Sequence, residues 1–171
     1  MTLLQSSLFV AAALAAGCAS QEETSSASIE AGSQIHAVLD GMGTAVQNQD
    51  VDAFMNFWAE SDSLVYTRQG RTFVGWDEVY ADAAQSFPNL GQLTRTQSEV
   101  FVNVLAPTSG VATTFTFLSS QREDGSTETA WFTFTAAIAR QPDQTWRVVQ
   151  AHSSYPLSGM SPRGQPENSP R

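Results

Sequence analysis

The chain has 171 residues and a net charge of −9, because seventeen acidic residues outnumber eight basic ones, all of them arginine. A surface that binds nucleic acid needs clustered positive charge, so this balance argues against such a partner. Apolar residues make up 42% of the sequence and charged residues 15%, which is too hydrophobic for a chain that stays unfolded. A single cysteine excludes an intramolecular disulfide and a thiolate zinc cluster. The length corresponds to about one domain.

The N-terminal residues 1–17 are predicted to be a signal peptide. The apolar run that ends at Ala16 is too short for a permanent membrane span but suits the apolar region of such a signal. Small residues then precede Cys18, and this ending resembles a bacterial lipobox, which implies that Cys18 carries lipid and becomes the mature N-terminus. Ala19 resembles the outer-membrane sorting signal, which implies a cell-envelope protein that faces the periplasm. The alternative is a buried N-terminal helix with an incidental cysteine.

The segments on either side of the central region are predicted to lie outside the folded domain. Residues 18–34, rich in Ser, Glu and Ala, hold few candidate core residues and predict a flexible tether that follows the lipidated Cys18. Residues 156–171 hold four of the seven prolines and predict a disordered tail. One domain over residues 35–155 remains.

Three helices are predicted in the first half of this domain. Apolar residues recur at steps of three and four from Ile35 to Val46, as on one face of an amphipathic helix. Asp50 is a good N-cap for a second helix, which Asp62 ends. A third helix is predicted over 76–87.

Strands are predicted between the second and third helices and after residue 93, where the apolar pattern becomes alternating. The expected strands are 64–67, 71–74, 100–105, 111–120, 129–140 and 145–153. The turns between the last four are too short for the crossovers of a parallel sheet, so an antiparallel meander is expected. The order of elements indicates an α+β fold, in which a curved antiparallel sheet wraps around the helices and forms a cone with an apolar pocket.

Three motifs resemble those of SnoaL-like, nuclear transport factor 2-like proteins. They are DVDAFMNFWAE over 50–60, FVGWDEV over 73–79 and WRVVQAHSS over 146–154, the last resembling the final strand of a small bacterial branch. The resemblance spans 35–155 in the expected order. It implies the cone-shaped fold and a homodimer formed through the outer face of the sheet. It does not imply an activity, because this fold carries enzymes, binding modules and dimerisation domains.

The catalytic positions of ketosteroid isomerases hold other residue types here. Their general-base aspartate falls at or beside Tyr66, and their oxyanion-hole tyrosine falls near Met42. A tyrosine cannot abstract a carbon-bound proton near neutral pH without a large fall in its pKa. These two departures from the ketosteroid isomerase residues therefore disfavour isomerase chemistry.

His152 is the strongest polar candidate for the pocket. Strict alternation along the last strand places it on one face with Trp146, Val148, Gln150 and Ser154, and the two apolar members favour the interior. A histidine there is a candidate general base or ligand donor, or a hydrogen-bonded core residue.

The expected pocket lining consists of side chains with a polar atom: Trp58, Tyr66, Tyr80, Trp131, His152 and Ser154. We expect three arginines to lie at the rim of the pocket and hold an anionic ligand, unless they are solvated surface residues. They are Arg68, Arg71 and Arg95. No metal-ligand spacing or nucleotide-binding motif is present, so neither a metal nor a cofactor is expected.

Three functions follow as hypotheses. The first is a lipid-anchored domain that binds a small, partly apolar molecule and forms a homodimer. The second is an isomerase, lyase or hydrolase that uses His152 as acid or base and Tyr66 as a hydrogen-bond donor. The third is a non-catalytic dimerisation or interaction module of the cell envelope.

Overall fold

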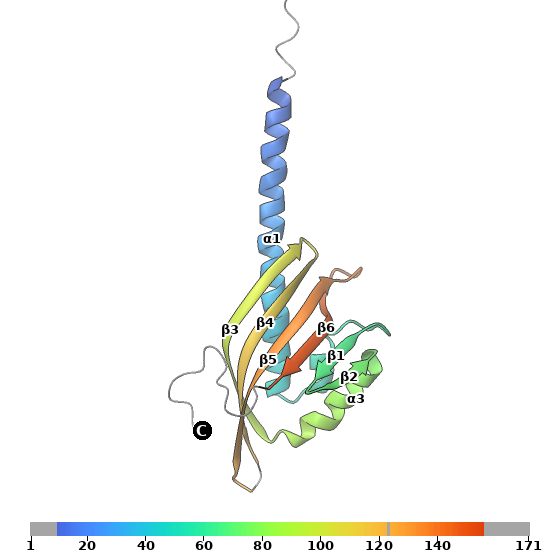
Figure 1. Ribbon diagram of the computed structural model, residues 1–171, viewed down its shortest axis with the longest axis vertical. Helices are drawn as coiled ribbons and strands as arrows, with labels where there is room; N and C mark the ends of the chain where they lie inside the picture. The colour runs from blue at the N-terminus through green and yellow to red at the C-terminus, as the bar shows by residue number, and fades with distance from the viewer. Residues whose placement is uncertain (1–9, 123, 156–171) are drawn as a thin grey trace, which may run out of the picture.

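The computed structural model describes residues 10–122 and 124–155 and shows helices followed by a curved sheet (Figure 1). The helices are α1 (Val10–Gln47), α2 (Val51–Met55) and α3 (Trp76–Ser86), the last followed by a 3-10 turn at Phe87–Asn89. The strands are β1 (Val65–Arg68), β2 (Arg71–Val74), β3 (Gln92–Ala106), β4 (Ser109–Gln121), β5 (Thr127–Arg140) and β6 (Trp146–Ser154). The predicted α+β class is confirmed.

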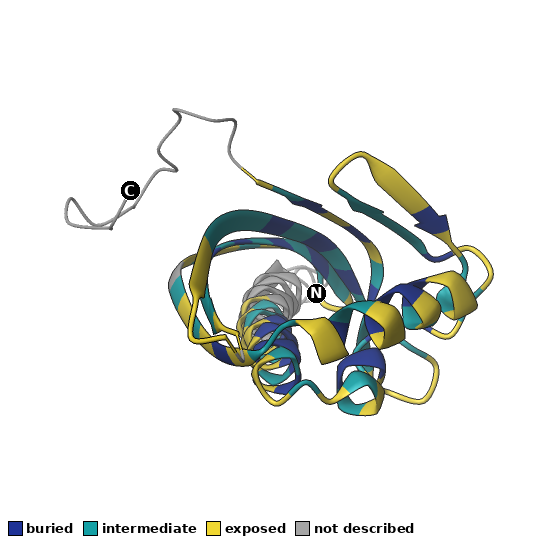
Figure 2. Ribbon diagram, turned by 90° about the horizontal axis from the view of Figure 1, so that it is seen from below, coloured by how far each residue is buried: buried dark blue, intermediate teal, exposed yellow. Residues whose placement is uncertain are grey.

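The strands form one sheet in the order β2-β1-β6-β5-β4-β3. The predicted meander from β3 to β6 is antiparallel throughout, and its turns are short. One pairing differs, because β1 lies parallel to β6, with Val65 opposite Gln150. These two strands are separated by most of the domain, so no short turn forces them to run in opposite directions. The sheet curves around the C-terminal part of α1 without closing (Figure 2).

Helix α1 begins much earlier than the apolar periodicity from Ile35 to Val46 predicts. It starts at Val10, so the segment 18–34, expected to be a flexible tether, is helical, and Ala31 within it is only 1% exposed. Ala, Glu and Gln are good helix formers, and the segment contains no proline to stop a helix. The N-terminal part of α1 projects beyond the sheet (Figure 1). Among the described residues, no helix is both long enough and apolar enough to span a membrane.

Two predicted segments lie partly or wholly outside the described residues. These are the first nine residues of the predicted signal peptide and the whole of the predicted tail, 156–171.

The start of helix α2 is set by the local sequence, and its end is set by tertiary pairing with the sheet. The carboxylate of Asp50 accepts a hydrogen bond from the Ala53 amide at 2.9 Å, which is the expected N-cap. The helix nevertheless ends at Met55. The reason is that the backbone of Phe57 and Ala59 bonds to Val148 of β6, at 2.8 and 2.9 Å. This pairing draws the end of the predicted helix onto the sheet and buries Trp58 completely.

Candidate functional site

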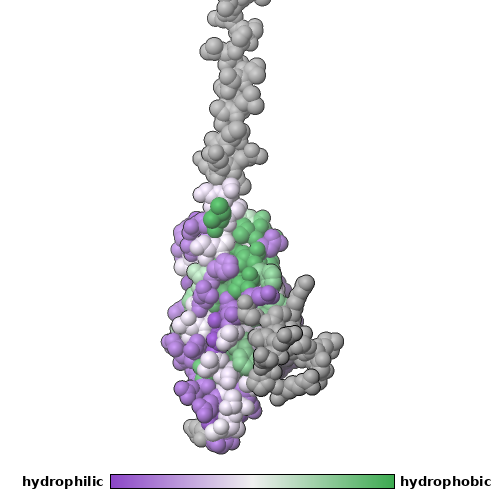
Figure 3. Space-filling model, turned by 90° about the vertical axis from the view of Figure 1, so that its left-hand side faces the viewer, coloured by the Kyte–Doolittle hydropathy of each residue, from purple (hydrophilic) through white to green (hydrophobic). Residues whose placement is uncertain are grey.

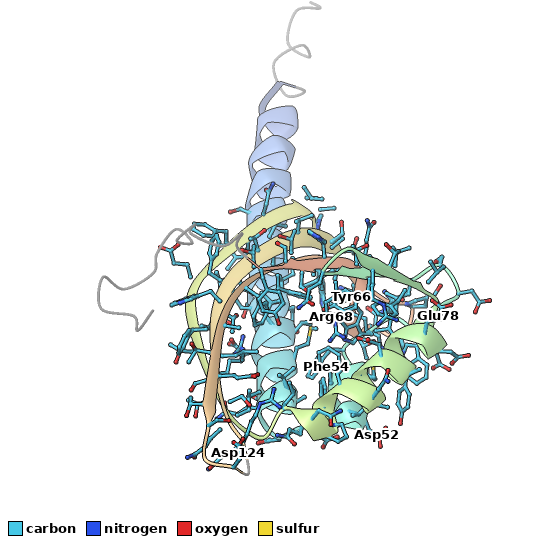
Figure 4. All side chains as sticks on the ribbon, turned by 60° about the horizontal axis from the view of Figure 1, so that its bottom comes forward. Asp52, Phe54, Tyr66, Arg68, Glu78 and Asp124 are labelled. Atoms are coloured by element: carbon cyan, nitrogen blue, oxygen red, sulfur yellow. The ribbon has the colours of Figure 1, made fainter. Side chains whose placement is uncertain are left out.

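A cavity of about 160 Å³ lies between the concave face of the sheet and the helices. Its walls are largely apolar: Leu39, Met42, Val46, Phe54, Val79, Ala83, Phe87, Leu90, Leu118, Phe132 and Phe134. Figure 4 shows Tyr66 and Arg68 on the strand side of this space and Phe54 on the helix side. The polar groups that line it come from both walls, and each has a different set of partners.

Tyr66 lies on β1 and lines the cavity. Its hydroxyl is 2.9 Å from the Oγ of Ser153 on the neighbouring strand β6. Burial raises the pKa of Tyr66 above its ordinary value, and the hydrogen bond with Ser153 opposes this effect only in part. The phenol is therefore neutral at physiological pH, and it is suited to hydrogen bonding rather than to proton abstraction.

Arg68, two residues further along β1, is tied to α3. Its Nη2 donates to Asp82 Oδ1 at 2.8 Å and to Ser86 Oγ at 3.2 Å. The Asp82 side chain is only 7% exposed, whereas that of Arg68 is 33% exposed. Asp82 and Ser86 lie on the face of α3 that also carries Val79 and Ala83, because side chains three and four residues apart share a helix face. The positive charge of Arg68 is thus matched within the protein.

Arg95 also lines the cavity, but it lies on β3, at the far edge of the sheet from β2 and β1, and has a different environment. Its guanidinium donates to Oε1 of Gln97 and lies so close to α1 that a Cβ atom on Gly43 would be 2.1 Å from Nη1. Burial lowers the pKa of Arg95, and the charge of Asp40 partly opposes this. Arginine remains protonated in proteins despite such shifts. Among the described residues, no carboxylate lies within ion-pair distance of it.

The prediction that His152 faces the interior is wrong. The residue is exposed, does not line the cavity and lies opposite Thr135 on the outer face of the sheet. The cause is a bulge, because Ile138 pairs with Val148 while Ala137 pairs with Gln150, which leaves one residue of β6 unpaired. Such a step moves every later side chain to the other face, so Ser153 points inward in its place.

Four other predicted lining residues also lie elsewhere. Trp58 is fully buried in the core. Tyr80 lies on the outside of the helices, where its hydroxyl donates a hydrogen bond to Asp52 Oδ1 at 2.9 Å. Trp131 packs against Phe117 on the outer face, with ring centroids 5.0 Å apart. The remaining one is Ser154, which follows the bulge and faces outward with His152.

Of the three arginines expected at the rim, two line the cavity and one does not. Arg68 and Arg95 line the cavity, whereas Arg71 is exposed and lies over the ring of Phe73. Sequence reasoning missed Asp82 and Ser86. The signal was present, because an aspartate within an apolar stripe of an amphipathic helix is unusual and implies a buried partner.

Among the described residues, no group of three His, Cys, Asp or Glu side chains is close enough to hold a metal ion.

Comparison with solved structures identifies the fold as nuclear transport factor 2-like. An NTF-2 like protein of unknown function from Shewanella oneidensis is 24% identical, with a TM-score of 0.57, over 71% of this chain and 96% of its own. An NTF2-like protein from Pseudomonas putida is 17% identical, with a TM-score of 0.66, over 83% and 98%. A putative dehydratase of the NTF2-like family from Streptomyces avermitilis is 18% identical, with a TM-score of 0.65, over 74% and 96%.

Within this fold, the model of the SnoaL-like domain matches residues 35–158, and the chain belongs to that family. No curated protein matches the chain. These similarities establish the fold and the family, and the function has to be argued from the cavity itself.

Proposed function

We propose that this SnoaL-like domain binds a small, partly apolar molecule in the cavity. The observation that carries the proposal is a space of about 160 Å³ with apolar walls and a few inward-facing polar groups. Ligand sites commonly combine these two features, because apolar walls supply affinity and sparse polar groups fix orientation. In another protein, an engineered cavity of about 150 Å³ binds benzene. A molecule of roughly that size or slightly larger suits this site.

The cavity groups favour binding over turnover. The titratable side chains among its described lining residues are Tyr66, Arg68, Asp82, Arg95 and Tyr155. Tyr66 is held neutral, and Asp82 is already engaged by Arg68. His152, the base on which the enzyme hypothesis relied, lies on the opposite face of the sheet. The geometry therefore gives the proposed enzyme no histidine at the cavity.

Native mass spectrometry of the full-length protein tests this proposal. We expect a bound small molecule that is lost in Ala83→Leu, because the larger side chain of this buried lining residue fills part of the cavity. Ala81→Leu is the matched control, since Ala81 is exposed on the same helix. An adduct that survives Ala83→Leu, or a wild-type protein without one, would contradict the proposal.

We further propose that lipid on Cys18 anchors the protein in the cell envelope, at the outer membrane and facing the periplasm. The support is the position of the chain's only cysteine directly after an apolar segment that ends in small residues. Metabolic labelling with a palmitate analogue should mark the wild-type protein, and Cys18→Ala should abolish the label. An unlabelled wild-type protein would overturn the anchor.

We also propose a homodimer through the outer face of the sheet. Phe101 and Leu105 of β3 are 54% and 63% exposed there, and hydrophobic surface gathers on this side of the molecule (Figure 3). Exposed apolar patches of this kind commonly mark protein interfaces. Light scattering should give the mass of a dimer for the wild type and of a monomer for Phe101→Glu. Val74→Glu, at a residue that is 53% exposed on β2, should remain dimeric. A monomeric wild type would refute this assembly.

A further inference from the structure

We infer that the molecule bound in the cavity is a small monocarboxylate with an apolar body, whose carboxylate pairs with the guanidinium of Arg95. This inference rests on the proposed function, because it names the chemical class of the ligand for the same cavity. It is carried by the charge balance of the lining, the partners of Arg95 and the size of the space.

The charge balance leaves one positive charge without a directly paired carboxylate. Arg68 and Asp82 form an ion pair at 2.8 Å and cancel one another. Arg95 donates to the neutral amide of Gln97. The charge of Asp40 acts on it from beyond ion-pair distance, and no described carboxylate lies within that distance. A partly buried charge is costly unless it is paired, and arginine cannot shed its proton to avoid the cost. One positive charge without an ion-pair partner favours a monoanion over a dianion such as a phosphate monoester.

The shape of the guanidinium selects among monoanions. Its planar fork of N–H groups matches the two oxygens of a carboxylate and forms short, charge-assisted hydrogen bonds. Gly43 allows this group to lie directly against α1, because any Cβ there would overlap it. The structure thus holds Arg95 at the wall of the cavity with only one described hydrogen-bond partner, Gln97.

The other residues that line the cavity indicate the chemistry of the rest of the ligand. The apolar walls and the volume of about 160 Å³ suit a single ring or a short alkyl chain. Thr114, which also lines the cavity, has a buried Oγ1 without a hydrogen-bond partner in the described structure. Such a group is costly when left unpaired. It therefore offers a hydrogen bond to a second polar atom of the ligand.

Calorimetric titration of the full-length protein in detergent tests the inference with benzoate and with benzyl alcohol, its uncharged counterpart. We expect benzoate to bind at least tenfold more tightly. Arg95→Gln should weaken benzoate binding by about ten- to a hundredfold, as loss of a charge-assisted hydrogen bond does, and leave benzyl alcohol unaffected. Arg140→Gln is the matched control, because Arg140 is exposed and does not line the cavity.

Gly43→Ala separates ligand binding from folding. Alanine favours a helix interior by about 1 kcal/mol over glycine, and the atoms it would displace belong to the flexible end of Arg95. We expect the variant to keep its thermal stability and to lose affinity for benzoate but not for benzyl alcohol. This outcome would support the inference even if Arg95→Gln failed to fold.

The binding results distinguish the carboxylate inference from the proposed small-molecule site on which it rests. Equal affinity for the two compounds, unchanged by Arg95→Gln or Gly43→Ala, would overturn the carboxylate inference and leave the small-molecule site intact. A protein that binds neither compound and carries no adduct in native mass spectrometry would overturn the proposed function together with the inference.

Discussion

Replacing Trp58 with alanine is expected to lower the free energy of unfolding by about 3–5 kcal/mol, the usual cost of removing a large buried aromatic side chain. Trp58 is 0% exposed, and its ring lies 5.1 Å from that of Tyr66 and 5.5 Å from that of Phe54. Its backbone also pairs with Val148 of β6. The side chain therefore packs α2 against strand β1 of the sheet, and its loss leaves a void in the core.

Urea unfolding followed by circular dichroism measures this loss. The matched control is Trp76→Ala, because Trp76 is half-buried and stacks on Tyr80, with ring centroids 5.1 Å apart. Its removal should cost about 1–2 kcal/mol, since the transfer of apolar surface scales with the area buried. If both variants lost the same stability, the central position of Trp58 in the core would be contradicted.

Arg68→Met is expected to cost about 2–3 kcal/mol, because it leaves Asp82 buried without its positive partner. This is below the usual cost for a fully buried pair, since Arg68 is 33% exposed and water screens part of the interaction. Asp82→Leu should cost less, about 1 kcal/mol, because the longer arginine side chain can turn its charge toward water.

A double-mutant cycle in urea checks this asymmetry. The combined variant Arg68→Met/Asp82→Leu should lose less stability than the sum of the two single changes, because no unpaired charge remains. Strictly additive losses would show that the ion pair between β1 and α3 contributes nothing to the fold.

The architecture was predictable because its signals are local. The periodicity from Ile35 to Val46, the N-cap at Asp50 and the turns between the late strands each act over a few residues. The end of α2 was missed because the chain beyond it pairs with Val148, about ninety residues away. The long extension of α1 does not follow from the sequence, because the composition of the polar segment 18–34 predicts a tether although it contains good helix formers.

The site was harder to predict because it depends on one unpaired residue. Strict alternation along β6 placed His152 inside, and the bulge beside Ala137 reversed the face of every residue that follows it. Bulges leave no reliable trace in the apolar pattern of a single strand. The sequence offers Arg68 and Arg95 as candidates, but only the structure shows that Asp82 pairs with Arg68 and that no described carboxylate lies within ion-pair distance of Arg95.

Site-resolved NMR during titration with benzyl alcohol tests most directly whether the cavity is the binding site. The methyl groups of Met42, Ala83 and Leu118 line the cavity, whereas those of Val111 and Ala137 lie on the outer face of the sheet. We predict that the first three resonances shift with added ligand, while the other two stay in place. A titration that moved only Val111 and Ala137, or no methyl group at all, would contradict a small-molecule site within the cone.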